Sequence, residues 1–521
     1  MKRYLVSASE MKRYDQNTTD IFKVPSLLLM ERAALVTVEE LQRERGKRPC
    51  KVLIAAGQGN NGGDGLAVGR LLMQQGYQVT FVQIGDPAKQ SAQTRQQREI
   101  LEAYWACFYD RIEGSEYAII IDALFGVGLS RNPEGIYAQT IHKINAIREK
   151  AHAYVCSIDI PSGIHSDTGA VMGCAVEADI TVTYGFEKLG QILYPGAFLC
   201  GKLCCRDIGI QKESFAGMPP LWYCLEDAQD APLQQRRADG NKGTFGKVLA
   251  IIGSSEICGA ALLATKAVFR SGTGMVKVVT AAENRETLQQ SVPEAMLLTY
   301  TEGETDSLEW REKLHRAFDW ADCILIGPGI GTAQDAERLL QESILNSDLP
   351  LVADADALNL LAGKKVLIET LQKQRERAVV LTPHLGEFAR LCKVTIPEVK
   401  KELLSYPRKL AEELCCTIVC KDARTVVVSH DKREGYLNIT GNSGMATAGS
   451  GDVLAGMIAG ILAQSGEADR AAVSGVLLHG IAGDLAAAKR TETSMMATDL
   501  SDHIQDVFKL ASQAKEEADV L

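Results

Sequence analysis

The sequence predicts two α/β domains, each built on a largely parallel sheet. The chain has 521 residues, more than one hydrophobic core usually organises, so two or more domains are expected. In both halves, short runs rich in valine and isoleucine alternate with helical patterns, as strands buried on both faces alternate with the helices that cover them. A polar, turn-rich stretch around Gly217-Met218-Pro219-Pro220 separates the two series.

The first series defines a domain at residues 1–212, followed by a linker at 213–235. Its apolar runs are nearly continuous, which favours a Rossmann-like sheet buried on both faces. The expected strands are Lys51–Ala56, Val79–Ile84, Ala118–Leu124, Tyr154–Ile160 and Ile180–Tyr184.

The second series defines a domain at residues 236–510. Thr425–Ser429 and Gly435–Ile439 are expected to pair as a hairpin near its end. The other expected strands are Val248–Ile252, Val276–Thr280, Cys323–Ile326, Leu351–Ala353, Val379–Leu381 and Thr417–Cys420.

Composition narrows the class of protein. Hydrophobic residues make up 46% and charged residues 23%, and the net charge of -10 argues against a nucleic-acid or membrane-surface role. The 14 cysteines include no CxxC pair, which favours reduced thiols in a cytoplasmic protein. The N-terminus lacks the apolar stretch of a signal peptide, and no segment is expected to reach the ~18 apolar residues of a membrane span.

The most informative motif is GMATAGSGDVLAG, Gly444–Gly456. Gly449, Ser450 and Gly451 lead into Asp452, and an apolar run with helical spacing follows at once. Free amides and the helix dipole at such a turn form an anion site, while the carboxylate can act on a substrate hydroxyl. The alternative is an ordinary glycine turn with Asp452 as the helix N-cap.

Four further loops follow expected strands of the second domain, where open α/β sheets bind ligands. Each loop by itself is equally compatible with an ordinary strand–helix turn. His384 by itself is equally compatible with a structural histidine. The loops are Gly253–Ser255 with Gly259–Ala261 behind it, Gly327–Gly331, Thr382–Phe388 and Lys421–Thr425.

These motifs resemble the ribokinase-like ADP- or ATP-dependent NAD(P)H-hydrate dehydratases across about residues 225–510. LTPHLGEFARL (Leu381–Leu391) and GMATAGSGDVLAG carry the resemblance. KGTFGKVLAIIGSS, GAALLATKAVFRSGTGMV and GPGIG support it. Ala448 stands where the family usually has a second glycine, and Lys421-Asp422-Ala423-Arg424 where it more often has Lys-Gly.

The resemblance implies a mechanism in which a phosphoryl group activates the hydroxyl of a hydrated nicotinamide, so that water leaves easily. Asp452 would deprotonate that hydroxyl, with Mg²⁺ at the phosphates. The residues expected at the nucleotide are Lys421, Asp422, Ala423, Arg424, Thr425, Gly449, Ser450 and Gly451. Those expected at the hydrated cofactor are Gly259, Ala260, Gly331, His384 and Asp452.

Three motifs of the first half also follow expected strands. Gly57–Gly65 contains GxGxxG, but the nearest candidate acidic partner, Asp86, comes too late for a conventional nicotinamide dehydrogenase. Asp122 and Asp159 each end an apolar run, where partial desolvation raises a carboxyl pKa and suits acid–base chemistry. Each acid by itself is equally compatible with a helix cap or a turn. The asparagines of the first motif are equally compatible with a flexible loop.

Together, NNGGDG, DALFGVGL and DIPSGI resemble the NAD(P)H-hydrate epimerase domain across residues 1–212. The resemblance implies a K⁺ site at Asn61, Asp122 and Ser162, and Asp159 as the proton-handling group. The residues expected at the cofactor are Asn60, Asn61, Gly62, Gly63, Asp64, Gly126, Val127, Gly128, Leu129, Ser130, Arg131, Asn132 and Asp159.

The sequence therefore predicts a bifunctional repair enzyme that interconverts the R and S forms of NADHX and NADPHX and dehydrates the S form with ADP or ATP. A homo-oligomer is expected, because this family tends to assemble. One alternative is a vitamin or sugar kinase with an accessory N-terminal binding domain. Another is that the first half is a binding module without turnover.

Overall fold

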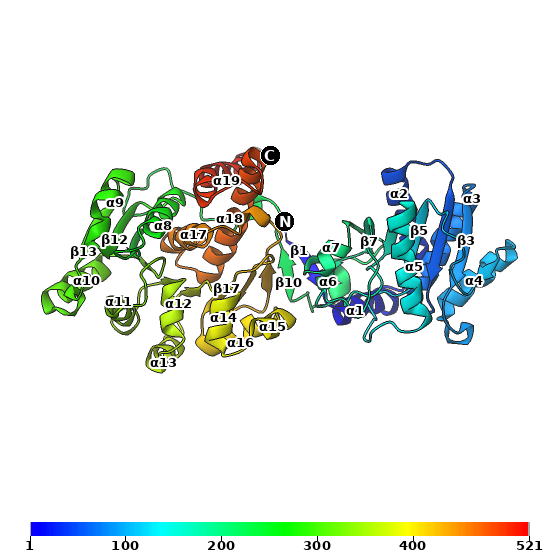
Figure 1. Cartoon of the computed structure of the whole chain (residues 1–521), viewed down its shortest axis with the longest axis horizontal. Coiled ribbons are helices and arrows are strands. Elements are labelled where there is room, and N and C mark those ends of the chain that lie inside the picture. Colours follow the sequence, from blue (N-terminus) through cyan, green and yellow to red (C-terminus); the bar gives the residue numbers. More distant parts are fainter. Residues whose placement is uncertain (1, 519–521) are drawn as a thin grey trace. The chain divides into compact units, whose positions relative to one another are not determined.

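Figure 1 shows the computed structural model of the chain, which describes residues 2–518 and the side chains of residues 2–512. The chain divides into two compact units, Tyr4–Leu221 and Met1–Arg3 with Trp222–Leu521. Each unit contains a sheet of mainly parallel strands with helices packed against it. The predicted α/β class is confirmed.

The first unit contains a sheet in the order β4-β3-β2-β5-β6-β7-β9, in which every neighbouring pair is parallel. The strand order reverses between β2 and β5, which is the position where such sheets bind ligands. The strands are β2 (Lys51–Ala56), β3 (Gln78–Gln83), β4 (Phe108–Tyr109), β5 (Ile119–Ala123), β6 (Tyr154–Ile158), β7 (Ile180–Tyr184) and β9 (Lys202–Arg206). A short parallel pair, β1 (Arg3–Val6) with β8 (Glu187–Lys188), lies outside this sheet.

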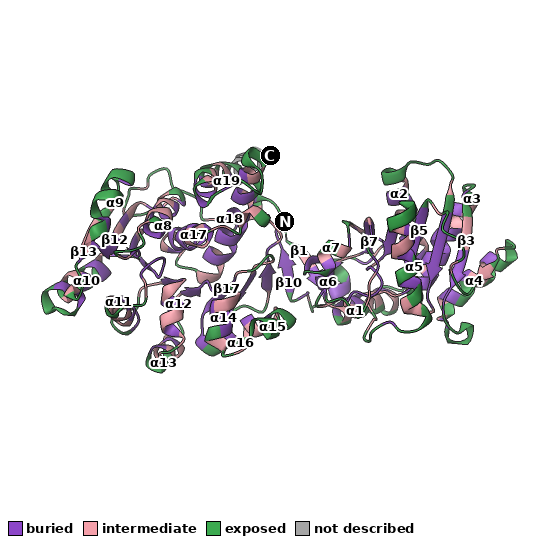
Figure 2. Ribbon diagram, in the orientation of Figure 1, coloured by how far each residue is buried: buried purple, intermediate pink, exposed green. Residues whose placement is uncertain are grey.

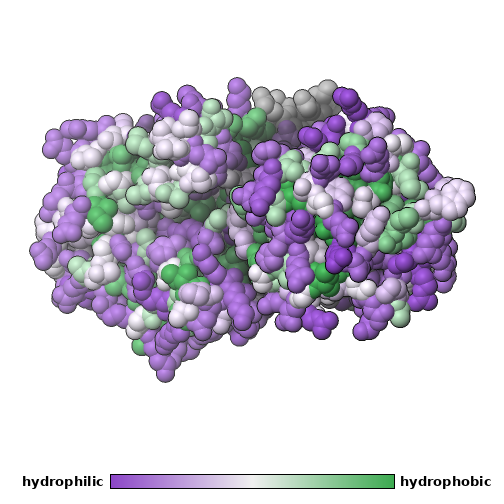
Figure 3. All heavy atoms as spheres, turned by 45° about the vertical axis from the view of Figure 1, so that its right-hand side comes forward, coloured by the Kyte–Doolittle hydropathy of each residue, from purple (hydrophilic) through white to green (hydrophobic). Residues whose placement is uncertain are grey.

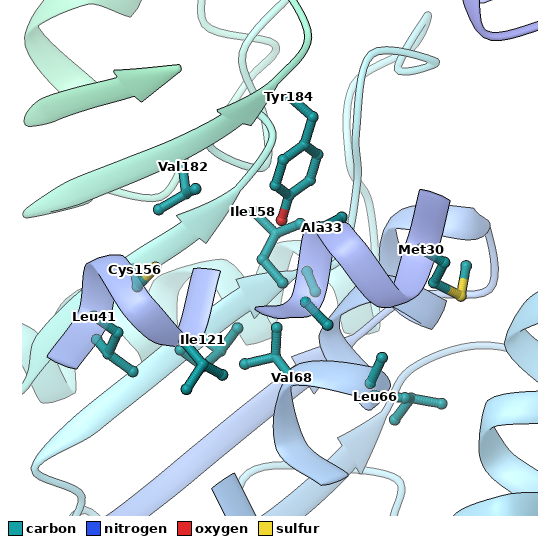
Figure 4. Close-up of a cluster of buried hydrophobic side chains, with 14 of the residues drawn as sticks. Met30, Ala33, Leu41, Leu66, Val68, Ile121, Cys156, Ile158, Val182 and Tyr184 are labelled. Atoms are coloured by element: carbon teal, nitrogen blue, oxygen red, sulfur yellow. The ribbon is translucent and has the colours of Figure 1, made fainter. Parts of the chain in front are cut away.

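Both faces of this sheet are buried, as the continuous apolar runs predict (Figure 2). Ile121 and Ile158 pack with α2 and α3 residues such as Ala33 and Val68 on one face (Figure 4). Ile120 packs with the α5 side chains on the other face. The helices are α1 (Ala8–Asp20), α2 (Ser26–Arg45), α3 (Asn60–Gln74), α4 (Ala92–Ala103), α5 (Ile136–Ala151), α6 (Leu189–Ile192) and α7 (Gly196–Leu199).

The second unit contains strands in the order β13-β12-β11-β14-β15-β16-β17-β18-β19-β10. Pairing is parallel from β13 to β17, and β17, β18 and β19 pair antiparallel, which confirms the expected hairpin. The strands are β10 (Trp222–Cys224), β11 (Lys247–Ile251), β12 (Met275–Ala281), β13 (Met296–Tyr300), β14 (Cys323–Ile326), β15 (Leu351–Ala353), β16 (Val379–Leu381), β17 (Thr417–Cys420), β18 (Val426–Ser429) and β19 (Gly435–Leu437).

Helix α17 lies in the core of this unit, against α8 and α18. A Cβ at Gly456 would lie 2.5 Å from the carbonyl oxygen of Ala264, so glycine lets α17 approach α8 closely. The helices are α8 (Gly259–Arg270), α9 (Arg285–Ser291), α10 (Leu308–Trp320), α11 (Gln334–Leu345), α12 (Asp356–Leu361), α13 (Lys365–Lys373), α14 (Leu385–Cys392), α15 (Ile396–Lys401), α16 (Ser405–Leu414), α17 (Ser450–Ser465), α18 (Ala468–Arg490) and α19 (Ala497–Ala518).

One helix departs from the expectation that no segment is apolar enough for a membrane span. Helix α18 meets that criterion by length and composition, with a mean hydropathy of 1.5 over its apolar window. However, 72% of the window is buried inside the protein, as in the core helix of a globular domain. Hydrophilic residues cover most of the molecular face shown in Figure 3, with apolar residues between them.

Candidate functional site

The glycine-rich motif of the first unit connects β2 to α3. Asn60–Gly65 lie in the first turns of α3, and only Gly57–Gly59 form the connecting loop. A Cβ at Gly57 would lie 2.0 Å from the Leu124 carbonyl oxygen, and one at Gly62 would lie 2.2 Å from the Gly57 carbonyl oxygen. Glycine is required at both positions because the backbone folds closely on itself. This packing brings the N-terminus of α3 to the carboxyl edge of the sheet.

A cavity of about 710 Å³ lies in this unit at the carboxyl ends of the strands. Ten of the predicted cofactor residues line it: Asn60, Asn61, Asp64, Gly126, Val127, Gly128, Leu129, Ser130, Arg131 and Asp159. The others, Gly62, Gly63 and Asn132, do not. Gly63 is buried against Met30 and Thr94, which indicates a packing role.

Asp122 lies at the end of β5, fully buried among hydroxyl and amide donors. The Ser157 hydroxyl donates to Oδ2 at 2.8 Å, and Ser162 donates its amide to Oδ2 at 2.8 Å and its hydroxyl to Oδ1 at 2.5 Å. Burial raises the pKa of Asp122, and these hydrogen bonds oppose the rise. Within residues 2–512, no lysine or arginine side chain forms an ion pair with this carboxylate. The side-chain amide nitrogen of nearby Asn61 is buried without a hydrogen-bond partner in the same range.

Asp159 follows β6 and is held by a lysine that the sequence reasoning missed. Lys188 is only 1% exposed and pairs its Nζ with Oδ1 of Asp159. The same ammonium group also donates to Thr183 Oγ1 at 2.7 Å and to the Tyr184 carbonyl at 3.2 Å. Lys188 follows the β7 strand by four residues, and a charged residue this close to the end of an apolar strand was the available signal.

Two more carboxyl groups line the same cavity. Asp64 and Asp15 make no side-chain hydrogen bond to another residue whose side chain the structure describes. Burial raises the pKa of Asp64 well above its usual value, and the nearby carboxylates of Asp159 and Asp15 raise it further. Burial also raises the pKa of Asp15, where Lys188 opposes the effect. The cavity therefore contains acidic groups in clearly different electrostatic surroundings.

In the second unit, backbone hydrogen bonds join the loops that follow parallel strands. The Gly253 amide donates to the Pro328 carbonyl at 2.8 Å, and the Lys421 amide to the Pro383 carbonyl at 2.8 Å. The GPGIG loop also lies against the start of α8, since a Cβ at Gly329 would be 3.0 Å from that of Ala260. The predicted loops thus meet at one edge of the sheet.

Lys421 forms a buried ion pair with Asp354, a residue that the sequence reasoning missed. Their Nζ and Oδ1 atoms lie 2.6 Å apart, and the side chain of Asp354 is 1% exposed. A Cβ at Gly451 would lie 3.3 Å from Lys421 Nζ and 3.8 Å from Asp354 Oδ2. The first turn of α17 therefore lies against this ion pair. Asp354 ends the buried strand β15, which is the same signal that singled out Asp122 and Asp159.

Asp452 lies in the first turn of α17, three residues after the N-cap, Gly449. The alternative that Asp452 itself caps the helix is therefore wrong. Burial is the main cause that raises the pKa of Asp452 to about 6; the negative charge of Asp354 adds to the rise and Lys421 opposes it. At neutral pH the carboxylate is ionised but more basic than an exposed aspartate.

The N-cap turn of α17 is held from both sides. Gly449 has φ 93, and a Cβ there would lie 2.5 Å from Leu263 Cδ1. His479 Nε2 donates to the Ser450 carbonyl at 3.0 Å, and burial lowers the pKa of His479 to about 4, so the ring is neutral. The Ser450 hydroxyl is buried with no hydrogen-bond partner among the described side chains, and it is available to a ligand.

His384 caps α14 and reaches solvent at the same time. Its Nδ1 accepts from the Gly386 amide at 2.9 Å, while Glu387 accepts from the His384 amide at 2.9 Å. The structural role of His384 is thus present, but 59% of its side chain is exposed. The amide of Gly331 donates to Asp356 Oδ2 at 2.9 Å, which ties that loop to the start of α12.

Asp422–Thr425 form the turn between β17 and β18. Thr425 donates its hydroxyl to the Asp422 carbonyl at 3.2 Å, and Arg424 donates to the Ile439 carbonyl at 3.2 Å. A separate cavity of about 820 Å³ in this unit is lined instead by residues at the opposite ends of β16 and β17, including Val379, Thr417 and Asp469. None of the predicted site residues line that second cavity.

Two family models match separate parts of the chain. The family model described as NAD(P)H-hydrate dehydratase matches residues 248–506, and the model described as YjeF-related protein N-terminus matches residues 26–190. A solved Enterococcus faecalis protein described as ribokinase-like is 31% identical, with a TM-score of 0.49 over 56% of this chain and 97% of its own. The dehydratase of Bacillus subtilis co-crystallised with ATP/Mg²⁺ is 30% identical, with a TM-score of 0.45 over 53% of this chain and 94% of its own.

Two curated relatives match almost end to end. The bifunctional NAD(P)H-hydrate repair enzyme of Moorella thermoacetica is 35% identical over 522 residues, which cover 97% of each chain. The enzyme of the same description from Escherichia coli is 31% identical over 502 residues, covering 96% of this chain and 93% of the relative. The chain therefore belongs to the family of bifunctional NAD(P)H-hydrate repair enzymes.

Proposed function

We propose that the chain repairs hydrated nicotinamide cofactors in two steps. The first unit interconverts the R and S forms of NADHX and NADPHX, and the second dehydrates the S form at the expense of ADP or ATP. The observation that carries the proposal is the meeting of the Asp354–Lys421 ion pair with the first turn of α17, where Asp452 lies. An anion-binding helix start, a cation and a basic carboxylate are the groups that phosphoryl transfer to a hydroxyl requires.

Dehydration needs activation of a poor leaving group. Transfer of a phosphoryl group to the substrate hydroxyl gives a phosphate ester. The phosphate then leaves with the C–O electron pair, the neighbouring ring carbon loses a proton, and the electrons of that C–H bond restore the ring double bond. Asp452, with its pKa raised to about 6, takes the hydroxyl proton. The amides of Gly449, Ser450 and Gly451 stabilise the charge on the moving group, and the unpartnered Ser450 hydroxyl adds a further donor.

The ligands of the second unit follow from the loop positions. Lys421, Asp422, Ala423, Arg424 and Thr425 bind the nucleotide. Gly259, Ala260, Gly331 and His384 bind the hydrated cofactor, with the exposed ring of His384 as the side chain available for contact. Mg²⁺ would neutralise phosphate charge during transfer, as hard divalent cations do in most nucleotide sites.

Epimerisation takes place in the 710 Å³ cavity, with Asp159 handling the proton. The start of α3 at Asn60, Asn61 and Asp64 and the loop from Gly126 to Arg131 surround the cofactor. Gly62, Gly63 and Asn132 support these segments without lining the cavity.

A K⁺ site at Asn61, Asp122 and Ser162 fits the donors present. Asp122 is a buried carboxylate without an ion-pair partner in the described chain, and such a charge calls for a cation nearby. Ser162 Oγ lies within hydrogen-bond distance of Asp122, and the Asn61 side chain offers an amide oxygen, while its buried amide nitrogen has no partner among the described residues. Carboxylate, hydroxyl and amide oxygens are the ligands that hard cations prefer. K⁺ would supply positive charge that organises this edge of the cavity.

The test is to supply purified protein with a mixture of R- and S-NADHX and either nucleotide. We expect full recovery of the reduced-nicotinamide absorbance band, with one free phosphate per NADH. A stable phosphorylated product would instead identify the alternative, a small-molecule kinase. Recovery of the S form only would indicate that the first unit is a binding module.

We further propose that the protein is a homo-oligomer in the cytoplasm. Sedimentation tests the oligomeric state, and cell fractionation tests the location.

A further inference from the structure

We infer that Asp64 and Asp159 are the acid and the base of epimerisation, and that Lys188 is the residue that positions Asp159. The inference rests on the proposed epimerase activity of the first unit and assigns its chemistry. Six charged side chains line the cavity: Lys12, Asp15, Asp64, Arg131, Asp159 and Lys188. Among them, the carboxyl groups of Asp64 and Asp159 differ most in their partners.

Asp159 is paired with a buried cation. Its Oδ1 atom pairs with Lys188 and accepts from Thr183 Oγ1 at 3.0 Å. Lys188 is almost fully buried, and its other contacts are the Thr183 hydroxyl and the Tyr184 carbonyl. A buried ammonium needs a compensating negative charge, and Asp159 is the carboxyl group that pairs with it. The contacts with Lys188 and Thr183 are both made to Oδ1, and Asp159 lines the cavity.

Asp64 has the opposite environment. It extends from α3 into the cavity, and no positively charged side chain in the described chain pairs with it. The groups that face it are the carboxyls of Asp159 and Asp15 and the phenol of Tyr184, all negative or neutral. Tyr184 is itself bonded to Thr37 at 2.7 Å. An uncompensated carboxyl beside other carboxylates keeps its proton, so Asp64 is the group able to give one.

Two carboxyl groups that line one cavity, one paired with a buried cation and one without such a partner among the described residues, have the environments expected of an acid–base pair. The hydrated ring carbon lies beside the ring nitrogen. Asp64 gives its proton to the hydroxyl, the C–O bond breaks, and water leaves with the bonding electron pair. The nitrogen lone pair then forms a planar C=N⁺ bond.

Water attacks the opposite face of that planar carbon. The new C–O bond forms, the C=N⁺ electron pair returns to nitrogen, and the water proton passes to Asp159. The net result is an inverted centre with one proton moved from Asp64 to Asp159. Exchange with solvent restores the starting state, and the reverse reaction uses the two groups in exchanged roles.

The experiment measures R-to-S conversion by the full-length protein in K⁺ buffer against pH, after subtraction of the uncatalysed rate. We expect a bell-shaped profile for the wild type. Asp64→Asn is expected to lower the maximum rate at least ~100-fold and to remove the alkaline limb, while Asp64→Glu restores part of the rate. Asp110→Asn, a matched change at an exposed aspartate of the same unit, is expected to leave the profile unchanged.

The role of Lys188 is tested on the acidic limb of the pH profile, because Lys188 acts through Asp159. Thr183→Val removes one hydrogen bond to Asp159 and is expected to move the acidic limb to higher pH with the alkaline limb unchanged. Lys188→Gln is expected to move the acidic limb to still higher pH. Melting curves check that each variant folds. If the wild type is active and Asp64→Asn is equally active, the acid–base assignment is wrong, while the epimerase proposal stands. An inactive wild type, in a preparation that still dehydrates S-NADHX, overturns the epimerase proposal and the pair with it.

Discussion

Lys421 Nζ lies 2.6 Å from Asp354 Oδ1, and the backbone of Gly451 lies against both groups. The cation is therefore fixed at the start of α17, next to the carboxylate of Asp452. Two strand ends, 67 positions apart in the chain, and one helix start supply the three groups. This relationship organises the predictions for the second unit.

Asp452→Asn is expected to lower nucleotide-driven dehydration by a factor of about 10² to 10⁴, because the amide cannot take the hydroxyl proton. The rate of NADH formation from S-NADHX measures this loss. R-to-S conversion by the first unit is expected to stay at the wild-type rate, which serves as an internal control. A variant that dehydrates at full speed would remove Asp452 from the role of base.

The dehydration rate is expected to fall as pH decreases through about 6. The pKa of Asp452 is raised to about 6, so the ionised base is present above that pH and lost below it. Single-turnover rates between pH 5 and pH 8, taken at saturating nucleotide, measure this acidic limb of the dehydration rate. Lys421→Met removes the charge that opposes the rise and is expected to move the limb to higher pH. A limb that stays in place would contradict this electrostatic account.

Lys421→Met is also expected to destabilise the second unit by about 3–5 kcal/mol, because it leaves Asp354 buried without its partner. Chemical unfolding followed by tryptophan fluorescence measures the loss. The double variant Lys421→Met with Asp354→Leu removes both charges and is expected to recover much of the stability. If the single variant were as stable as the wild type, the ion pair would not be a buried one in solution.

His479 predicts a loss of stability in acid. Burial lowers its pKa to about 4 from a usual value near 6.5, so the unfolded chain binds the proton more readily than the folded one. Its contribution is complete above pH 6.5 and is lost progressively as pH falls towards 4, by about 3 kcal/mol in total. Melting temperatures of the wild type and of His479→Gln measure it. The variant is expected to melt lower at pH 7.5 but to show a weaker dependence on pH.

The K⁺ proposal is tested by replacing K⁺ with tetramethylammonium, which is too large for a site built from Asn61, Asp122 and Ser162. We expect R-to-S conversion to slow while dehydration of the S form continues. Ser162→Ala removes the hydroxyl that lies 2.5 Å from Asp122 and is expected to weaken the response to K⁺. Identical epimerisation rates in the two salts would contradict the assignment.

The strands that the sequence predicts well are the buried central ones. Ile180–Tyr184 and Cys323–Ile326 match their strands end to end, because a strand covered on both faces is apolar throughout. Met296–Tyr300 and Lys202–Arg206 were missed, since they are edge strands with partly exposed residues. Edge strands bury less surface, so their sequences carry a weaker pattern.

The site residues divide in a similar way. Glycine-rich motifs predict where loops meet, because close backbone approach excludes a Cβ, as at Gly57 and Gly62. The ion-pair partners of charged residues are harder to predict from the sequence. Asp354 meets Lys421 across 67 positions, and Lys188 meets Asp159 across 29, so only the folded chain brings each pair together.

The most direct measurement is a crystal structure of the Asp452→Asn variant with nucleotide and S-NADHX. The account predicts the terminal phosphate within about 3 Å of the Gly449–Gly451 amides, with the substrate hydroxyl beside residue 452. A nucleotide bound away from Lys421 and the start of α17 would contradict it.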